Sequence, residues 1–433
     1  MKKLVWLGAL LCLALPSWAQ KEYGLQFSSL INDDLTLESA IRLGLENNSA
    51  FLSAQQEIII AEQKVKEAKF RFLPQISLQG TATWYDLDYP MVLPESVANR
   101  FIPSNSLLED GAKHQFFGVG VSATQYLYTG GRLRSTLKMA QANLKQAQSK
   151  YESVKNAVVL DIKKSFFRLL CAQQNQQLAA AVQKKASVYT RAMALPAWDR
   201  VKAQYLQSRL SSLQNEAANE VQKARLAMLV SLNKELNSSI SVKGDFKPVE
   251  VKLDLPHLNL WSMEFRPELK TAIYALELDT LAIDFALSRR YPDLILTGSY
   301  ERLGPDDLDD ENKQISLAVR LPLPYNLSSQ TVQRKAEQKQ STLRRAAIED
   351  KIRVQVAENY AELVFWQAEV FSRQRAWQEV QKTLAQAEKT ARPGVSALEA
   401  LDAYYQTGKN YYDAVRHNLA SKAGLEWAIG KDL

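Results

Sequence analysis

The most regular pattern in the chain is a strict alternation of apolar and polar residues. In ISLQGTATW, residues 76–84, the apolar positions face one way, and the Ser, Gln and Thr positions face the other. Such alternation predicts a strand with one apolar and one polar face. Each strand has about 10 residues, which is the length of a tilted strand that crosses a hydrocarbon layer. Four such strands are expected, over 76–86, 115–128, 294–303 and 313–325.

Long helices are predicted before and after these strands. Residues 34–75 and 265–293 place apolar residues at helical spacings, and Pro74 and Pro292 are expected to end these helices. Thr36 is the expected N-cap of the first helix. Residues 132–192 contain neither Pro nor Gly, and their apolar residues recur at alternating spacings of 4 and 3, the heptad pattern of helices that pack side by side. Residues 331–391 predict a second helix of equal length. A short turn and a return helix follow each long helix, forming an antiparallel hairpin.

The order of these elements occurs twice along the chain. Each unit reads helix, strand, loop, strand, long helix, turn and return helix. At an offset of 200 positions, LPAWDRVKA (195–203) aligns with VSALEALDA (395–403). An internal repeat of this kind predicts two related units, which we place at 20–264 and 265–433.

The first residues predict export from the cytoplasm. MKKLVWLGALLCLALPSWAQ has two lysines, an apolar run and a small-x-small cleavage site, so residues 1–19 are expected to be a signal peptide. Beyond it, no run reaches the ~18 apolar residues of a transmembrane helix. Removal of Lys2 and Lys3 lowers the net charge from +7 to +5, and no basic cluster indicates nucleic-acid binding. Only Cys171 remains, so no intrachain disulfide is expected.

Residues that would carry catalysis or bind a cofactor do not form a recognisable pattern. The three histidines, His114, His257 and His417, lack metal-ligand spacing, and no nucleotide-binding or nucleophile motif occurs. We therefore expect no enzyme, cofactor or metal site. The acidic run in 306–311 could bind a divalent cation. We prefer a solvated loop, because the run lacks the Gly and Glu of a calcium loop.

Four strands are too few to form a closed sheet in a membrane. Closed membrane barrels start at eight strands, and an unpaired edge in lipid is not tolerated. The alternative is four surface strands of a soluble sandwich, for which four strands are also few. If the strands lie in a membrane, other copies of the chain must complete the sheet, and three copies would give twelve strands.

Several segments together resemble the outer-membrane efflux protein (TolC) family over about 35–430. They are LTLESAIRLGLENNSAF, AEQKVKEAKFRFLPQISLQG, QYLYTGGRLRSTLKMAQANL and RPGVSALEALDAYYQTGKNYYDAVRHNLASKAGLEWAIG. The resemblance implies a mainly α fold with a small β part. Long antiparallel helical hairpins would form a periplasmic α-barrel, and four strands from each chain of a homotrimer would form a 12-stranded β-barrel in the outer membrane. The apolar strand faces would then contact lipid and the polar faces a water-filled lumen.

The same resemblance implies a passive exit duct of a tripartite efflux or type I secretion system. Its partners would be a periplasmic adaptor (membrane fusion) protein and an inner-membrane efflux pump or ABC exporter. The runner-up is a periplasmic adaptor or another coiled-coil structural protein without a membrane barrel, although adaptors normally have one hairpin flanked by compact β modules. The residues leave open whether the cargo is a drug, a metal ion or a secreted protein.

Two acidic residues of the second hairpin are candidates for a constriction. Glu399 and Asp402 are three positions apart, so they share a helix face. In the family, acidic residues at these positions line the periplasmic mouth; the alternative is an ordinary solvated helix face. The first hairpin has Asp199 and Lys202 at the equivalent positions. The family also usually has Gly in both periplasmic turns, whereas here only Gly394 keeps it. The expected adaptor-docking residues are Ala194, Leu195, Pro196, Arg392, Gly394, Val395 and Ser396.

Overall fold

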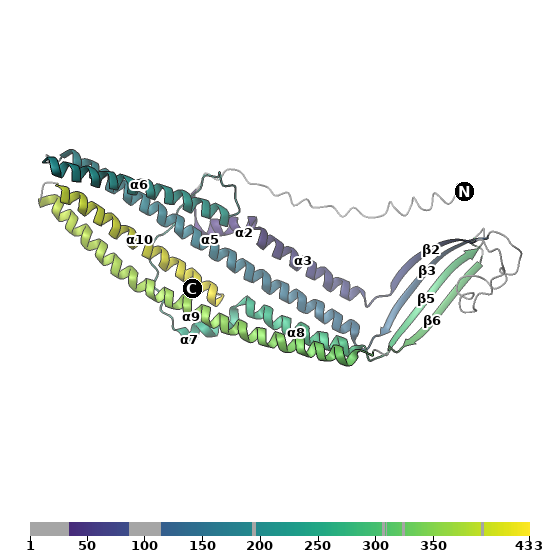
Figure 1. Cartoon of the computed structure of the whole chain (residues 1–433). Coiled ribbons are helices and arrows are strands. Elements are labelled where there is room, and N and C mark those ends of the chain that lie inside the picture. The colour runs from purple at the N-terminus through teal and green to yellow at the C-terminus, as the bar shows by residue number, and fades with distance from the viewer. Residues whose placement is uncertain are drawn as a thin grey trace.

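The computed structural model describes an elongated molecule with a helical layer and a sheet at one end (Figure 1). The described residues are 34–85, 114–192, 196–304, 308, 310–322, 325–390 and 394–433. The expected signal peptide therefore lies outside them. The elements come in the repeated order that the sequence predicts. The division into units at 264 and 265 stays a prediction. None of the described helices is long and apolar enough to cross a membrane.

Four strands form one antiparallel sheet. They are β2 (Gln75–Tyr85), β3 (His114–Tyr128), β5 (Asp293–Gly304) and β6 (Asp310–Arg320), and they lie in the order β2-β3-β5-β6. The first three agree with the prediction to within one residue at each end. The fourth was predicted to extend to 325 but ends at Arg320, because Pro322 lacks the N–H group that a further ladder bond needs.

The register of the sheet aligns the apolar faces of all four strands. Ile76, Ala123, Gly298 and Ile315 occupy one row across the sheet. The next row consists of Ser77, Ser122, Ser299 and Gln314, and the hydroxyls of Ser77 and Ser122 are hydrogen-bonded at 2.7 Å. The sheet thus has one apolar and one polar surface. In this single chain the apolar surface is uncovered, since Ile76 is 75% and Ile315 86% exposed.

The first predicted helix is interrupted, which corrects the prediction of one helix over 34–75. Residues Asp34–Leu35 form a short strand, β1, followed by α2 (Leu37–Asn47) and α3 (Ser49–Phe70). Thr36 caps α2, as predicted, by accepting a hydrogen bond from the N–H of Ser39. Asn48 is extended and accepts the N–H of Phe51 at 3.0 Å, so it ends one helix and caps the next.

The matching segment of the second half is also divided. The predicted helix over 265–293 corresponds to α8 (Pro267–Ser288), which begins two residues later and ends five residues earlier. A further helix that the sequence analysis missed, α7 (Leu255–Phe265), precedes it. Arg266 separates the two in an extended conformation, which is the backbone geometry that a residue before proline favours.

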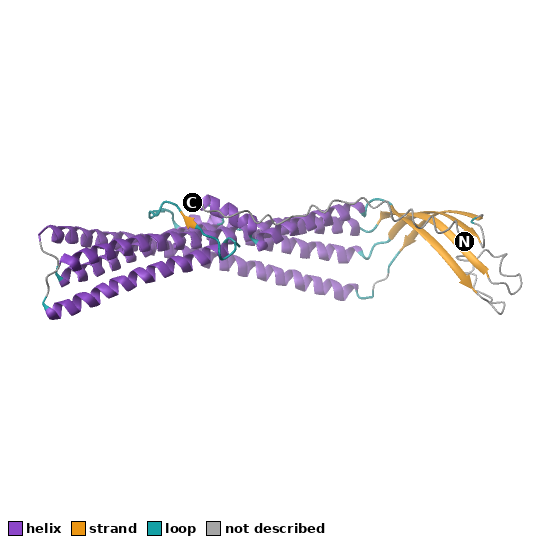
Figure 2. Ribbon diagram, turned by 90° about the horizontal axis from the view of Figure 1, so that it is seen from above, coloured by secondary structure: helices purple, strands orange, loops and turns teal. Residues whose placement is uncertain are grey.

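Two long helices extend along the whole helical layer. They are α5 (Arg132–Ala192), with the predicted bounds, and α9 (Leu327–Thr390), which begins four residues earlier than predicted. The return helices α6 (Ala197–Ser231) and α10 (Val395–Ile429) cover only the half that is remote from the sheet, and α3 and α8 cover the other half (Figures 1 and 2). The neighbours are α3-α5-α8-α9 near the sheet and α6-α5-α10-α9 in the remote half. The heptad stripe at the start of α5 therefore contacts α3 and α8, not α6.

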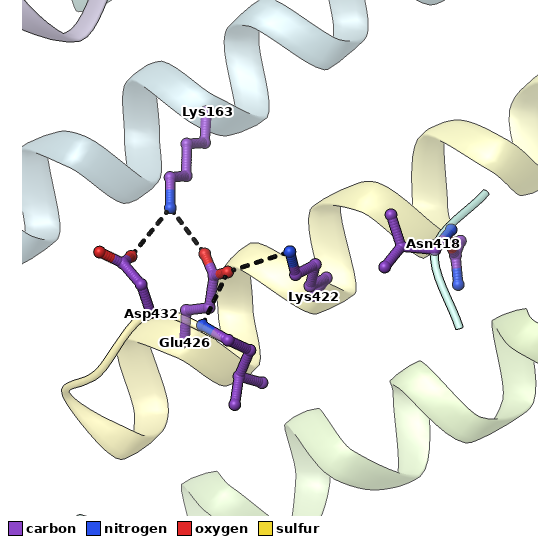
Figure 3. Close-up of polar contacts among 7 residues, drawn as sticks. Lys163, Asn418, Lys422, Glu426 and Asp432 are labelled. Carbon is purple, nitrogen blue, oxygen red and sulfur yellow. Dashed lines mark hydrogen bonds and ion pairs between the residues drawn. The ribbon is translucent and has the colours of Figure 1, made fainter. Parts of the chain in front are cut away.

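An extended segment crosses the helical layer at mid-length. We call residues 241–254 the belt. Its strand β4 (Ser241–Val242) pairs in parallel with β1. Further on, the buried side chain of Asn418 (Figure 3) accepts the N–H of Val249 at 2.8 Å. Phe246 packs against the buried cluster that includes Val415. The belt thus connects the first helical hairpin, which it follows, to α10 of the second.

The junction between sheet and helices is fixed by one turn and one ion pair. Gly130 and Gly131 have positive φ angles of 61° and 89°. A Cβ atom on Gly130 would lie 2.7 Å from the carbonyl oxygen of Ser288, so a side chain is excluded there. Arg132, at the start of α5, binds both carboxylate oxygens of Asp293, at the start of β5, at 2.9 and 2.8 Å. This pair ties the first strand-to-helix turn to the second half of the chain.

Candidate functional site

The predicted docking residues that the structure describes lie where α6 and α10 begin, at the end of the helical layer that is remote from the sheet, which we call the tip (Figure 1). Pro196 is the N-cap of α6, and Gly394 is the N-cap of α10 in an extended conformation. Val395 and Ser396 are the first residues of α10. Ala194, Leu195 and Arg392 lie outside the described residues.

Glu399 and Asp402 lie near the start of α10 and face the first hairpin. Lys202 Nζ lies 2.7 Å from a carboxylate oxygen of Glu399, and Arg209 Nη2 lies 2.9 Å from one of Asp402. The Asp402 side chain is only 16% exposed. Both cations belong to α6. Lys202 is the equivalent of Asp402 in the first hairpin. These ion pairs could not be predicted from the sequence, because only tertiary packing brings α6 and α10 together.

In each pair, one cationic side chain of the same chain offsets the charge of one carboxylate. The hydrogen bond to Glu399 and the charge of that carboxylate raise the pKa of Lys202. Solvent screens a pair as exposed as Lys202–Glu399, so it is a weak connection between the hairpins. Asp402 differs, since its second carboxylate oxygen is buried without a hydrogen-bond partner among the described residues.

A second polar contact at the tip joins α5 to α9. Lys185 Nζ lies 2.9 Å from Glu388 Oε1, and the Tyr189 hydroxyl donates to the same oxygen. Burial and this bond raise the pKa of Tyr189 to about 12. The donors Tyr189 and Lys185 lower the pKa of Glu388. Because the pKa of Glu388 is lowered in the folded state, its contact stabilises the fold at pH values above the usual pKa of a glutamate. This contribution to the free energy of unfolding is lost as the pH falls through the lowered pKa.

A groove of about 630 Å³ lies beside this contact, between α5 and the second hairpin. Its lining is mostly apolar and includes Val188, Leu384, Ala397 and Ala400. The lining also includes charged residues, among them Lys184 and Glu388. The two sides of the groove are about 200 positions apart in sequence, so no local pattern predicts it.

The described residues contain no group of three or more His, Cys, Asp or Glu side chains that could hold a metal ion. In the acidic run, Asp306, Asp307 and Asp309 lie outside the described part of the chain. Asp310 and Glu311 begin β6, and Glu311 is paired with Lys313 at 3.0 Å. The prediction of a solvated loop at 306–311 stays untested.

Comparisons with known proteins match part of the chain to a family model and its fold to solved structures. Residues 40–195 match the family model described as outer membrane efflux protein. The fold is similar to that of CusC, a channel-forming protein, with a TM-score of 0.75, 16% sequence identity and 92% of each chain covered. The open state of the MtrE outer membrane channel of Neisseria gonorrhoeae gives a TM-score of 0.74 at 17% identity, covering 91% of this chain and 89% of the other.

The outer membrane protein VceC of Vibrio cholerae gives a TM-score of 0.72 at 14% identity, with 92% of this chain and 96% of that chain covered. At these identities the likeness concerns the fold. A search of curated protein sequences gives no match to this chain.

Proposed function

Since residues 40–195 carry an outer membrane efflux protein domain and the chain has the fold of outer-membrane channels, we propose that this protein is the exit duct of an efflux or secretion system. Three copies form one channel in the outer membrane, with the helical layer in the periplasm. The duct itself is passive, and an inner-membrane pump or exporter supplies the energy. A periplasmic adaptor docks at the tip.

The observation that carries this proposal is that the sheet and the helical layer each have two free edges, and that their elements follow the same order from one edge to the other. Within one chain β2 pairs only with β3, and β6 pairs only with β5. The helices follow the same order, so α3 and α6 lie at one edge and α9 at the other. Exposed apolar side chains occur on both edges; they include Val201, Leu226 and Val230 on α6 and Leu343, Val354 and Phe365 on α9.

Two different edges favour a head-to-tail contact between copies. Such a heterologous contact forms a closed ring when the rotation per copy divides a full turn. In a ring of three, β6 and α9 of one copy meet β2 and the α3–α6 edge of the next. The sheet then has twelve strands without a free edge, its apolar face contacts lipid and its polar face surrounds water.

The adaptor alternative is not favoured by any observation. An adaptor would have one hairpin flanked by compact β modules. The described residues instead contain two hairpins of similar length and one four-stranded sheet whose apolar face is uncovered.

At the periplasmic mouth we assign the constriction to Glu399 and Asp402. Three copies place six carboxylates around one axis, with Lys202 and Arg209 as their counter-ions. A multivalent cation that displaces these monovalent cations gains the attraction of several carboxylates at once. The mouth should therefore bind trivalent cations.

Single-channel recording of the purified protein in a planar bilayer tests both the duct and its mouth. We expect conducting channels that a trivalent cation blocks from the periplasmic side, and we expect Glu399→Ala/Asp402→Ala to lose the block. The matched variant Lys202→Ala/Arg209→Ala should keep or strengthen it, because the carboxylates are then free. Block that persists in the carboxylate variant would show that these side chains lie outside the ion path. A protein that forms no channel would contradict the proposed function.

A further inference from the structure

We propose that Glu301 sets the ion preference of the duct at its sheet end. This inference rests on the proposed closure of three sheets with their polar faces inward. It concerns a residue at the opposite end of the molecule from the mouth carboxylates. It also identifies a selectivity element in the strands themselves, whose polar face otherwise carries small and neutral side chains at mid-sheet.

The register places Glu301 on the polar face. It lies in β5 opposite Gly120 of β3 and Asn312 of β6, and Gly120 in turn lies opposite Gln79 of β2. This row lies two residues further from the helical layer than the row of Ser77, Ser122 and Ser299. Because side chains alternate along a strand, both rows share the polar face. Glu301 therefore projects from the same surface as the serine hydroxyls.

A glycine on the neighbouring strand holds the Glu301 side chain in place. A Cβ atom on Gly120 would lie 2.7 Å from Cγ of Glu301 and 3.4 Å from its Cβ. The stem of Glu301 thus lies across the backbone of β3, in space that any other residue at 120 would fill. The half-buried state of Glu301 agrees with this position. The stem therefore keeps the carboxylate close to the wall, in the row of Gly120 and Asn312.

The charge of Glu301 is not neutralised by the described residues. It makes no ion pair there, and the loop-side half of the polar face carries no Lys or Arg among the described strands. Asp310, on the same face, adds a further negative charge. The situation differs at the other end of the sheet, where Arg132 pairs with Asp293. On the apolar face, Glu311 is paired with Lys313 at 3.0 Å and accepts from the Tyr300 hydroxyl.

The expected size of the effect follows from the dimensions of the ring. Twelve strands spaced about 4.8 Å apart and tilted by about 40° close into a cylinder about 12 Å in radius. At ~10 mM salt the Debye length is about 30 Å, so three carboxylates at the wall act on the whole cross-section and enrich cations about three-fold. At ~1 M salt the Debye length is about 3 Å, and the effect disappears.

Reversal potentials in a shallow KCl gradient near ~10 mM test the proposal on the full-length channel, where screening is weak. The background is Glu399→Ala/Asp402→Ala, which removes the mouth carboxylates. In it, Glu301→Gln should lower the cation-to-anion permeability ratio at least about three-fold, because the potential that enriches cations also depletes anions, and Glu301→Lys should lower it further. Both shifts should vanish at ~1 M salt. Glu311→Gln is the matched control, because it removes a carboxylate from the same sheet end but from the opposite face.

The outcomes separate this inference from the proposed function. If the parent channel does not conduct, the proposed function fails. If the parent conducts and Glu301→Gln leaves the permeability ratio at low salt unchanged, or Glu311→Gln shifts it equally, Glu301 does not set the preference and the inference is overturned.

Discussion

Leu317→Arg should abolish the assembled trimer, whereas Ser316→Arg should leave it intact. Leu317 lies on the apolar face in the middle of β6, and it is 63% exposed in the single chain. An arginine near the midplane of a membrane barrel costs ~2–4 kcal/mol, and the trimer would incur this cost three times. Ser316 lies opposite Thr297 on the polar face, where an arginine stays in water. The measurement is the amount of cross-linked trimer in isolated outer membranes.

The neighbouring position makes this pair of variants a matched comparison. Both introduce the same side chain into the same strand, and only the face differs. An equal loss of trimer in both variants would show that the faces are assigned wrongly. Normal assembly of both would show that this surface of the sheet does not contact lipid.

Arg266→Ala should destabilise the helical layer by about 3–5 kcal/mol, the usual cost of removing one partner of a buried charged contact. The Arg266 side chain is 3% exposed and lies 4.3 Å from the ring centroid of Trp427. It donates to the Trp427 carbonyl at 3.0 Å and to Gln355 at 2.8 Å, and its Nε lies 2.9 Å from Glu268. One side chain therefore connects the start of α8, the end of α10 and the middle of α9.

Urea unfolding of the purified protein would measure this loss. Arg289→Ala is the control, because Arg289 lies at the other end of α8 and is exposed; it has a 3.3 Å hydrogen bond to Gln330 and lies 5.6 Å from the ring centroid of Phe285. Such a surface change typically alters stability by less than about 0.5 kcal/mol. Equal midpoints for the two variants would show that the Arg266 contacts contribute no more than a surface arginine.

Local sequence signals predicted most of the fold. Residues 132–192 have no helix breaker, and the Gly130–Gly131 turn and Pro196 bound them, so the structure reproduces α5 without change. Strict alternation similarly located the strands and their apolar faces. The division at Asn48 was missed because an asparagine within an apolar periodic segment is compatible with a helix as well as with a cap. The belt was missed because its position depends on distant side chains such as Asn418.

The same distinction applies to the tip. The spacing of Glu399 and Asp402 was enough to place both on one helix face. Their counter-ions Lys202 and Arg209 lie almost 200 positions earlier, and only the packing of α6 against α10 reveals them. A similar long-range polar contact lies near the end of α10, where Lys163 of α5 binds Glu426 at 2.6 Å (Figure 3).

Disulfide trapping between the sheet edges tests the central claim most directly. In a Cys171→Ser background, Ser77→Cys on β2 is combined in turn with Asn312→Cys, Gln314→Cys or Ser316→Cys on β6. Within one chain, β2 and β6 are separated by three inter-strand distances, about 14 Å in total. A disulfide needs Cα atoms within about 7 Å. Any bond formed must therefore join two copies. We predict that, for one of these cysteine pairs, oxidation in native outer membranes links chains covalently and that the largest product contains three chains. A ladder that ends at one or two chains, or that continues beyond three, would contradict the closed trimer.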